Sequence, residues 1–465
     1  MVRATPPSQP SKADIVVIGG GIMGVAAAFF LARSGVSVVL CEKGVVAGEQ
    51  SSRNLGWCRT LGRDPAEMQL MLESLKLWRE SDALLSQQTG YRTTGLLYGY
   101  DDEKDIARRK DWLDVAAAHG VDTKVLRGRD IEALLPGAGK LPRIAFYTAG
   151  DGRAVPGMAT HAFANAARLR GVVILENCAV RVLETSAGRV SGVVTEHGLI
   201  GCGAVLLAGG AWSRAFAGNA GIDLPQLKAI SSVMSTSAVA GGPDVTTTIG
   251  SYAFGRRQDG GYTVSGSFSV IADIVPDSFR QFGRFIGSFW AARDKIRLRL
   301  GPAFLEAWRR PGRWTAGEPS PFEAVRTLDP APLTRQLDAC WRDLCRDFPA
   351  FRQARIVRRW GGAIDATPDM LPIISQVAAL PGLVISTGYS GHGFGLGPAA
   401  GRLAADLLTG ADPIVDPRPF RLDRFRSSRR PRTEKDQGPK NQAEERQALA
   451  AFDNNTGTIT GRKYA

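Results

Sequence analysis

The stretch that most constrains this chain is residues 13–42, ADIVVIGGGIMGVAAAFFLARSGVSVVLCE. Residues 15–18 form the continuous β-branched run that is typical of a strand buried on both faces of a parallel sheet. Gly19, Gly21 and Gly24 follow as G-x-G-x-x-G and open an apolar helix. Such a turn lets backbone N–H groups approach a pyrophosphate at the helix N-terminus. The pattern predicts a βαβ unit that binds a dinucleotide.

An acidic residue, Glu42, ends the second expected strand of this unit. At that position a carboxylate accepts hydrogen bonds from both ribose hydroxyls of an adenosine and repels a 2′-phosphate. A glycine triplet alone is weak, because it also occurs in ordinary turns. The strand before it, the helix after it and the acid beyond make the dinucleotide interpretation the favoured one.

Length and composition indicate a globular enzyme of two domains. The chain has 465 residues, of which 44% are hydrophobic and 22% charged, which is ordinary for a soluble protein. The first residues lack the apolar core of a secretory signal, and we expect a cytoplasmic protein without a transmembrane segment. Its six cysteines and four histidines are scattered, so we predict neither a metal site nor a disulfide framework.

The formal net charge of +13 is partly concentrated in the tail at residues 426–465, which holds nine Lys and Arg and five Asp and Glu. The tail is polar, and we predict that it is disordered. Elsewhere the basic residues are mixed with acidic ones and accompany no nucleic-acid-binding motif. We therefore expect no nucleic-acid partner.

Three further motifs follow the first. They are GEQSSRN at residues 48–54, VLLAGGAWS at 205–213, and WGGAIDATPDMLPII at 360–374 followed by GYSGHGFGLGPAAG at 388–401. The second and third each place glycines between an expected strand and a helix, where backbone comes close to a cofactor. A β-rich block at 224–268 and a helical, aromatic block at 278–348 lack such motifs and are the candidate substrate domain.

With these motifs in order, residues 13 to about 425 resemble the D-amino-acid oxidase family of FAD-dependent amine oxidoreductases. The resemblance implies an α/β fold, with a discontinuous Rossmann-like FAD-binding domain and a substrate domain built on a mixed or antiparallel sheet. The expected division is a tail at 1–12, FAD-binding segments at 13–90, 150–223 and 357–425, substrate segments at 91–149 and 224–356, and the tail at 426–465.

The resemblance also implies which residues hold FAD. The pyrophosphate is expected at Gly19, Gly21, Ile22, Met23 and Gly24, the adenosine ribose at Glu42 and Lys43, and the adenine at the backbone of Val180. A loop near the pyrophosphate and flavin is expected at Ser51, Ser52, Arg53 and Asn54, a second cofactor contact at Gly209, Gly210 and Trp212, and the loop under the isoalloxazine at Gly388, Gly391, His392, Gly393 and Phe394. Because no cysteine lies near 388–397, we expect FAD to be bound noncovalently.

Four residues are candidates for the substrate site. Arg59 is expected to grip a substrate carboxylate, and Asp365 replaces an arginine of some relatives and would attract a cationic amine. His392 is either a structural residue of the flavin loop or a general base. Tyr252 either lines the pocket or packs in a sheet. A pair of Arg59 and Asp365 suggests a basic D-amino acid or an opine as substrate.

The expected reaction is oxidation of a C–N bond in an amino acid or secondary amine by hydride transfer to flavin N5, after which water hydrolyses the imine. No lysine occupies the positions where sarcosine-oxidase-like relatives activate oxygen, so we expect slow turnover with oxygen and faster turnover with a dye or quinone. The alternatives are an FAD-dependent 2-hydroxy-acid dehydrogenase and a non-catalytic FAD-binding subunit of a larger complex.

Overall fold

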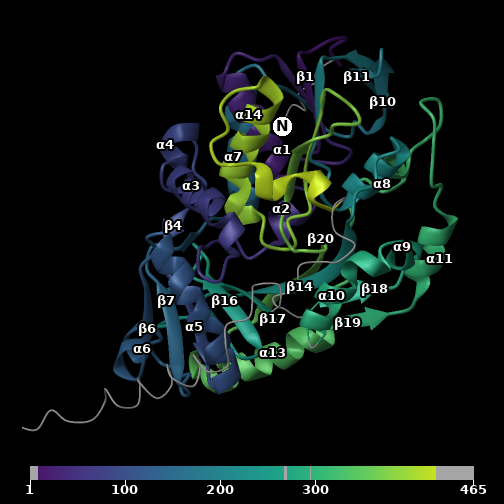
Figure 1. Ribbon diagram of the computed structural model, residues 1–465. Coiled ribbons are helices and arrows are strands. Elements are labelled where there is room, and N and C mark those ends of the chain that lie inside the picture. Colours follow the sequence, from purple (N-terminus) through teal and green to yellow (C-terminus); the bar gives the residue numbers. More distant parts are fainter. Residues whose placement is uncertain (1–8, 267–269, 294, 426–465) are drawn as a thin grey trace, which may run out of the picture.

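The computed structural model describes residues 9–266, 270–293 and 295–425. They form a mixed α/β fold built on two large sheets, which occupy the upper and lower halves of Figure 1. The predicted disorder of residues 426–465 and most of the expected N-terminal tail lie outside the described residues. Within the described residues, no helix is both long and apolar enough to cross a membrane.

The first sheet is parallel except at one edge. Its order is β21 (Ile373–Gln376), β22 (Leu383–Thr387), β13 (Ala204–Leu207), β1 (Ile15–Ile18), β2 (Val38–Cys41) and β9 (Val173–Leu175). Only the β21–β22 pair is antiparallel. Alternate residues of these strands enter two different cores, so Val17 belongs to one cluster and Val16 to the other. The sheet is therefore buried on both faces, as the continuous apolar runs predict.

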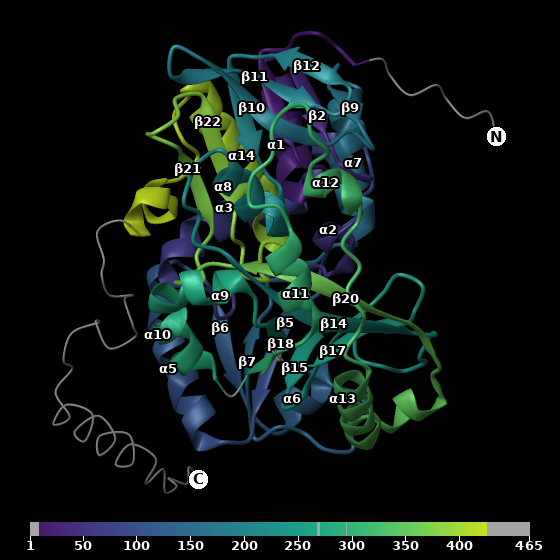
Figure 2. The same ribbon diagram turned by 90° about the vertical axis from the view of Figure 1, so that its right-hand side faces the viewer.

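Helices cover one face of this sheet, and a small antiparallel sheet covers the other (Figures 1 and 2). The helices are α1 (Ile22–Arg33), α7 (Pro156–Arg168), α14 (Gly397–Thr409) and α3 (Met68–Arg79). Helix α1 packs very closely on α14, because a Cβ on Gly401 would lie 2.5 Å from the Ala26 Cβ. The small sheet comprises β10 (Val180–Ser186), β11 (Arg189–Thr195) and β12 (Gly198–Gly201).

The second sheet has ten strands and is mixed. Its order is β19 (Ile296–Arg299), β18 (Val270–Asp273), β14 (Leu227–Thr236), β17 (Tyr262–Gly266), β16 (Tyr252–Arg256), β15 (Thr246–Ile249), β5 (Leu96–Tyr100), β7 (Ile144–Thr148) and β6 (Thr123–Leu126), while β20 (Ile356–Ala366) pairs with β14. Helices α13 (Thr334–Asp347) and α5 (Glu103–Ala118) contribute to its two cores. The remaining helices of this half include α6 (Arg129–Leu134), α9 (Pro276–Arg280), α10 (Phe282–Ala292) and α11 (Pro302–Arg309).

A fourth, very short sheet brings together segments that are distant in sequence. Strand β8 (Gly152–Arg153) is antiparallel to both β3 (Trp57–Cys58) and β4 (Arg92–Thr93). In this sheet Trp57 and Arg92 are both register partners of Arg153. A two-residue strand has almost no hydrophobic pattern, so sequence periodicity does not reveal it.

Residues 65–85 form a 3₁₀ turn (Pro65–Glu67), α3 and α4 (Ser81–Leu85). The structure differs from the expected elements in three places. Strand β12 was not expected, and β19 lies in a stretch that reads as helical. Strand β20 begins at the expected boundary near residue 357, yet it pairs with β14 of the second sheet along almost its whole length. It thus extends the second sheet from inside the third expected FAD-binding segment.

Candidate active site

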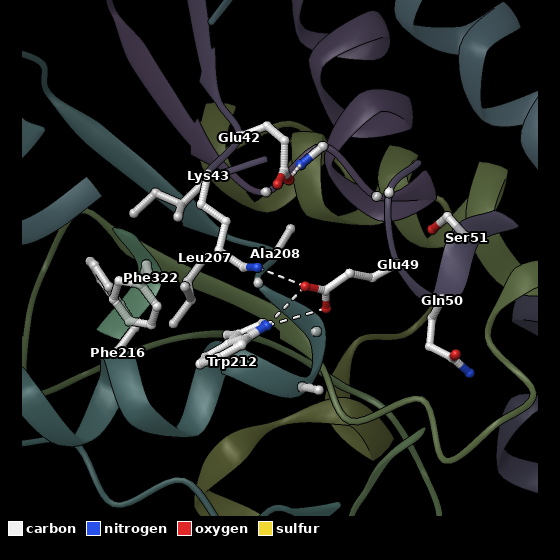
Figure 3. A pocket seen from close by; sticks show the side chains of 18 of the residues that line it. Glu42, Lys43, Glu49, Gln50, Ser51, Leu207, Ala208, Trp212, Phe216 and Phe322 are labelled. Carbon is white, nitrogen blue, oxygen red and sulfur yellow. Dashed lines mark hydrogen bonds and ion pairs between the residues drawn. The ribbon is translucent and has the colours of Figure 1, made fainter. Parts of the chain in front are cut away.

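A cavity of about 130 Å³ opens at the carboxyl ends of β1, β2 and β13 (Figure 3). Ligands of open α/β sheets bind at this end of the strands. Its lining includes many of the residues expected to bind a cofactor, namely Gly19, Gly21, Glu42, Lys43, Ser51, Val180, Gly209, Gly210 and Trp212. Four distant segments of the sequence therefore meet at one site.

The glycine turn has the geometry that an anion site needs. Gly19 has a φ of +112°, and a Cβ on Gly24 would lie 1.9 Å from the Gly19 carbonyl oxygen. Both positions therefore require glycine. The N-terminus of α1 has no side-chain cap of its own, although the Ile22 N–H donates to Ser51 Oγ at 2.8 Å. Backbone donors of the first turn, to which Met23 belongs, remain for a ligand.

Glu42 is fixed at the end of β2 by two backbone groups. Its Oε2 accepts a hydrogen bond from the Gly20 N–H at 2.7 Å, and its Oε1 accepts one from the Gly44 N–H at 2.8 Å. Burial raises the pKa of Glu42, while these two N–H groups favour its charged form. Each carboxylate oxygen has a further lone pair, so Glu42 can also accept hydrogen bonds from a ribose.

Glu49 is a residue of this site that the sequence analysis missed. Its carboxylate accepts hydrogen bonds from Lys43 Nζ at 2.6 Å and from Trp212 Nε1 at 3.1 Å (Figure 3). Lys43 also donates to the carbonyl oxygens of Val325 and Arg326. It therefore links the segment at 325–326 to Glu49 in the lining of the cavity. The available signal was the position of Glu49 inside the motif at 48–54.

Three positively charged side chains lie close to the ring of Trp212. The ammonium groups of Lys43 and Lys228 lie 4.7 and 4.4 Å from the ring centroid, and the Arg310 guanidinium lies 5.4 Å from it. Burial, and then the neighbouring Arg310, lowers the pKa of Lys228 to about 8. Glu49 is the one carboxylate that hydrogen-bonds the indole. The wall beside the cavity is therefore suited to an anionic ligand.

Helix α2 (Gln50–Arg53) forms another wall of the cavity. Arg53 donates to the Gly361 carbonyl oxygen at 3.1 Å and pairs with Asp329, and Asn54 Nδ2 donates to the Gln50 carbonyl oxygen at 2.9 Å. Ser52 Oγ donates to the Glu49 carbonyl oxygen at 3.2 Å. These contacts hold the loop, and the buried Gln50 Oε1 has no partner among the described residues.

Asp365 lines the cavity and hydrogen-bonds the loop that follows β22. Its Oδ2 accepts hydrogen bonds from the Gly388 N–H at 2.7 Å and from Thr387 Oγ1 at 3.1 Å. Its own carbonyl oxygen accepts one from the Ser390 N–H. Burial raises the pKa of Asp365. These contacts favour a structural role, in contrast to the expected attraction of a cationic amine.

The expected flavin loop is also tied to the segment after Arg59. The Glu67 carboxylate lies 3.0 Å from His392 Nε2 and 3.2 Å from Arg63 Nη1. Burial alone would raise the pKa of Glu67, but His392 and Arg63 lower it to about 2. Arg63 Nη2 also donates to the His392 carbonyl oxygen at 2.8 Å. His392 is thus oriented by an ionised carboxylate.

The loop has other fixed points. Gly388 and Gly391 have φ values of +76° and +86°, and a Cβ on Gly393 would lie 2.5 Å from the Tyr389 Cβ. The Phe394 ring packs against the buried Trp78, with centroids 5.2 Å apart. The glycines therefore serve a tight backbone path, and Phe394 anchors it to α3.

Arg59 and Tyr252, two of the residues predicted for the substrate site, both have partners within the protein. Arg59 Nη1 donates to the Leu61 carbonyl oxygen, and its guanidinium lies 5.8 Å from the centroid of the Tyr98 ring. Tyr252 is 1% exposed and donates to Asp347 Oδ2 at 3.0 Å inside the core of the second sheet. Tyr252 is absent from the lining of the cavity at β1, so its contacts favour the sheet-packing interpretation.

The geometry fits the dinucleotide that the resemblance implies. A glycine turn, an uncapped helix N-terminus, a ribose-binding carboxylate and an orphaned Gln50 oxygen surround one cavity. A ligand with a pyrophosphate and several hydroxyl groups satisfies all four. In the part of the chain that the structure describes, no three His, Cys, Asp or Glu residues are arranged to hold a metal ion.

Comparison with known sequences gives one family. A model of the FAD dependent oxidoreductase family, DAO, matches residues 14–407. Sarcosine oxidase subunit beta from Arthrobacter sp is 27% identical over 90% of this chain and 92% of its own length. Glycine oxidase from Pseudomonas putida is 26% identical over 88% of this chain and 97% of its own.

Comparison with solved structures agrees. L-Amino acid deaminase from Proteus myxofaciens, solved with anthranilate, is 37% identical with a TM-score of 0.88 and covers 91% of this chain and 96% of its own. L-Amino acid deaminase from Proteus vulgaris is 35% identical with a TM-score of 0.87, over 91% of this chain and 100% of its own. Since these matches span most of the chain, the protein belongs to the DAO family of FAD-dependent oxidoreductases.

Proposed function

We propose that this protein oxidises the C–N bond of an α-amino acid of L configuration, with FAD bound noncovalently as its cofactor. The observation that carries the proposal is the similarity of nearly the whole chain to two L-amino acid deaminases at 35% and 37% identity. That similarity replaces the basic D-amino acid or opine suggested by Arg59 and Asp365, whose side chains are held by protein contacts.

The first sheet acts in this proposal as a discontinuous, Rossmann-like FAD domain. Gly19, Gly21 and the first turn of α1 bind the pyrophosphate, and Glu42 binds the adenosine ribose. Trp212 and the loop at 388–394 enclose the remaining parts of FAD. The domain boundaries expected from the sequence remain part of the proposal. Strand β20 falls in the third FAD-binding segment of that division, although it pairs with β14 of the second sheet.

The state of two cysteines near the site, Cys41 and Cys58, supports noncovalent attachment. A covalent link through cysteine requires a reactive thiolate. Burial raises the pKa of Cys58 well above its ordinary value, and hydrogen bonding to Cys178 and burial do the same for Cys41. Both residues are buried, and neither is suited to attack a flavin.

FAD would supply the acceptor for a hydride from the carbon that carries the nitrogen. The protein binds the neutral amine, orients its Cα–H bond and limits the access of water. Glu67 and Arg63 fix His392 and hence the loop at 388–394. Water then hydrolyses the released imine to a ketone and ammonia, for which no side-chain base is needed.

The electron acceptor belongs to the same proposal. Gly395 stands where sarcosine-oxidase-like relatives carry a lysine, so we propose slow reoxidation by oxygen and faster reoxidation by a quinone or dye. Rapid stoichiometric production of peroxide in air would contradict this part. One relative is a subunit of a larger oxidase, which makes a partner subunit a further acceptor to test.

The experiment is an anaerobic flavin-reduction screen. The purified protein is mixed with L-amino acids, D-amino acids, N-methyl amino acids, opines, polyamines and 2-hydroxy acids, and the flavin absorbance is followed. We expect bleaching by L-amino acids, with the FAD-free variant Gly21→Ala as the control. Bleaching by 2-hydroxy acids alone would support the dehydrogenase alternative. A yellow protein that no compound bleaches would support the non-catalytic subunit.

A further inference from the structure

At the short sheet that joins distant segments, a buried arginine and the buried indole nitrogen of a partly buried tryptophan have no hydrogen-bond partner among the described residues. Arg153, on β8, is 5% exposed, yet among the described residues no hydrogen bond or ion pair joins its guanidinium to another side chain. The buried Nε1 of Trp57, on β3, likewise has no hydrogen-bond partner within the described residues. Buried polar groups are nearly always paired in native proteins, so two adjacent orphans indicate a ligand.

The two groups converge on one point. A Cβ built on Gly255 of β16 would lie 3.4 Å from Arg153 Nη1, 3.6 Å from Trp57 Nε1 and 3.7 Å from Thr246 Oγ1. Thr246 Oγ1 lies 3.2 Å from Thr94 Oγ1, and its hydroxyl can still accept or donate one more bond. A side chain on Gly255 would be in van der Waals contact with all three groups, so glycine keeps this side of β16 free of a side chain beside them.

The chemistry of this group selects an anion. A guanidinium and an indole N–H are donors without acceptor capacity, so their common ligand must supply lone pairs. Burial first lowers the pKa of Arg153, to about 10, and the group therefore stays charged at neutral pH. Asp244 is the acid that most raises the pKa of Arg153, and its carboxylate already forms an ion pair with Arg92 at 3.3 Å. A carboxylate matches a planar guanidinium with two parallel hydrogen bonds.

The position is also next to the expected flavin loop. A Cβ on Gly395 would lie 2.8 Å from the Trp57 carbonyl oxygen and 3.1 Å from the Cys58 Cα. Trp57 therefore contacts that loop through its backbone, while its indole nitrogen lies near Gly255 of the second sheet. A group bound there would sit between the loop and the second sheet.

The geometry points to Arg153 and the indole N–H of Trp57 as the site that binds the carboxylate of the amino-acid substrate, with Gly255 providing its space. This assignment rests on the proposed function for the identity of the ligand. It replaces Arg59, whose guanidinium already donates to a carbonyl oxygen and lies over Tyr98. The carboxylate would be held at one end of the substrate, leaving the Cα–H bond free to face the flavin.

The test measures binding of benzoate to the FAD-loaded protein by calorimetry, with the neutral isostere benzamide as the ligand control. We expect benzoate to bind and benzamide to bind at least about tenfold more weakly. Arg153→Met should weaken benzoate binding more than about tenfold and leave FAD content unchanged. Gly255→Ala should have a similar effect, because its methyl group would occupy the space beside the three donors.

Two matched variants complete the design. Arg143→Met removes an exposed arginine that pairs with Glu103 and has no contact with this group, and Arg59→Met removes the other candidate. Both should retain benzoate affinity within about threefold. Gly255→Ala keeps the result interpretable if Arg153→Met fails to fold.

Benzoate affinity that is unchanged in both Arg153→Met and Gly255→Ala would overturn the assignment, as would loss in Arg59→Met alone. The binding assay needs no turnover. A protein that binds benzoate through Arg153 but oxidises no amino acid would keep this inference and reject the proposed function. A protein whose flavin is reduced by amino acids, but whose benzoate affinity is unchanged in Arg153→Met, would keep the proposed function and reject this inference.

Discussion

The two ends of the proposed cofactor site differ in how their polar groups are satisfied. At the nucleotide end, the carboxylates of Glu42 and Glu49 are held by backbone and side-chain donors at 2.6 to 3.1 Å. At the end near the flavin loop, Arg153 and the indole N–H of Trp57 have no acceptor among the described residues. This difference is what we expect if the first end holds the cofactor tightly and the second binds the substrate reversibly.

The largest expected effects are at the nucleotide end, where one glycine is needed for folding and another for FAD binding. A Cβ on Gly24 would lie 1.9 Å from a backbone oxygen, whereas a Cβ on Gly21 would meet only Ser51 Oγ at 3.1 Å. Gly24→Ala should therefore disrupt folding, and Gly21→Ala should fold but lose FAD, because its methyl group occupies the approach of the pyrophosphate. Circular dichroism and flavin content measure the two outcomes. Full FAD content in Gly21→Ala would place the pyrophosphate elsewhere.

A second prediction concerns the charge that fixes His392. Glu67 has a pKa of about 2 in the folded protein against an ordinary 4.5. A depressed carboxyl pKa adds stability above the unfolded value, and this stability is lost as pH falls from about 4.5 toward 2. Glu67→Gln should lower the unfolding free energy at pH 7 by roughly 3 kcal/mol.

Urea unfolding at pH 7 and at pH 4 measures this effect. The difference between Glu67→Gln and the wild type should be smaller at pH 4. Glu73→Gln is a control, since Glu73 pairs with Lys76 at the surface and such pairs contribute about 1 kcal/mol or less. If the unfolding free energies of Glu67→Gln and the wild type differ by an equally small amount at both pH values, the pair with His392 and Arg63 does not stabilise the folded state.

A third prediction tests whether Asp365 holds the loop or the substrate. An amide oxygen can still accept the Gly388 N–H, so Asp365→Asn should cost only about 1 kcal/mol of stability. The preference among neutral and cationic amino acids should stay unchanged. A selective loss of lysine or arginine oxidation in this variant would restore the substrate role that the sequence suggested.

The smallest expected effect concerns the excess charge at Trp212. The pKa of Lys228 is lowered to about 8 from 10.5, so below pH 8 folding buries an ammonium group that prefers water. That penalty disappears as pH rises from about 8 to 10.5, where the folded and then the unfolded state become neutral. Lys228→Met should stabilise the FAD-free protein at pH 7 by about 1 kcal/mol and weaken FAD binding. Thermal unfolding at pH 7 and 10.5 with and without FAD measures both.

Sequence patterns predicted many of the residues that line the cavity at β1, because the geometry of this region is local. The turn at Gly19–Gly24 and the acid at Glu42 are set by one βαβ unit, and the structure brings both to one cavity with Val180, Gly209 and Trp212. The family and the mixed α/β fold are confirmed. The pairing of β20 with β14 of the second sheet could not be predicted, because the glycine-rich sequence of β20 resembles a cofactor loop.

The other end could not be predicted, because its contacts are not local. Arg153, Trp57 and Gly255 are far apart in sequence and meet only through two-residue strands that carry no periodic signal. For the same reason the pairing of Glu67 with His392 was missed. Tyr252 was nominated as an aromatic residue in a β-rich block, and only its bond to Asp347 shows that it serves the core.

The central claim is most directly tested by anaerobic stopped-flow reduction of the flavin with a matched substrate pair. The pair is the L-amino acid that reduces the flavin fastest and the amine that remains when its carboxylate is removed. We predict that the wild type prefers the amino acid by roughly a hundredfold or more in second-order rate constant, about 2.7 kcal/mol, and that Arg153→Met narrows this preference at least about tenfold. Equal rates for the two wild-type substrates, or no reduction by any amino acid, would contradict the account.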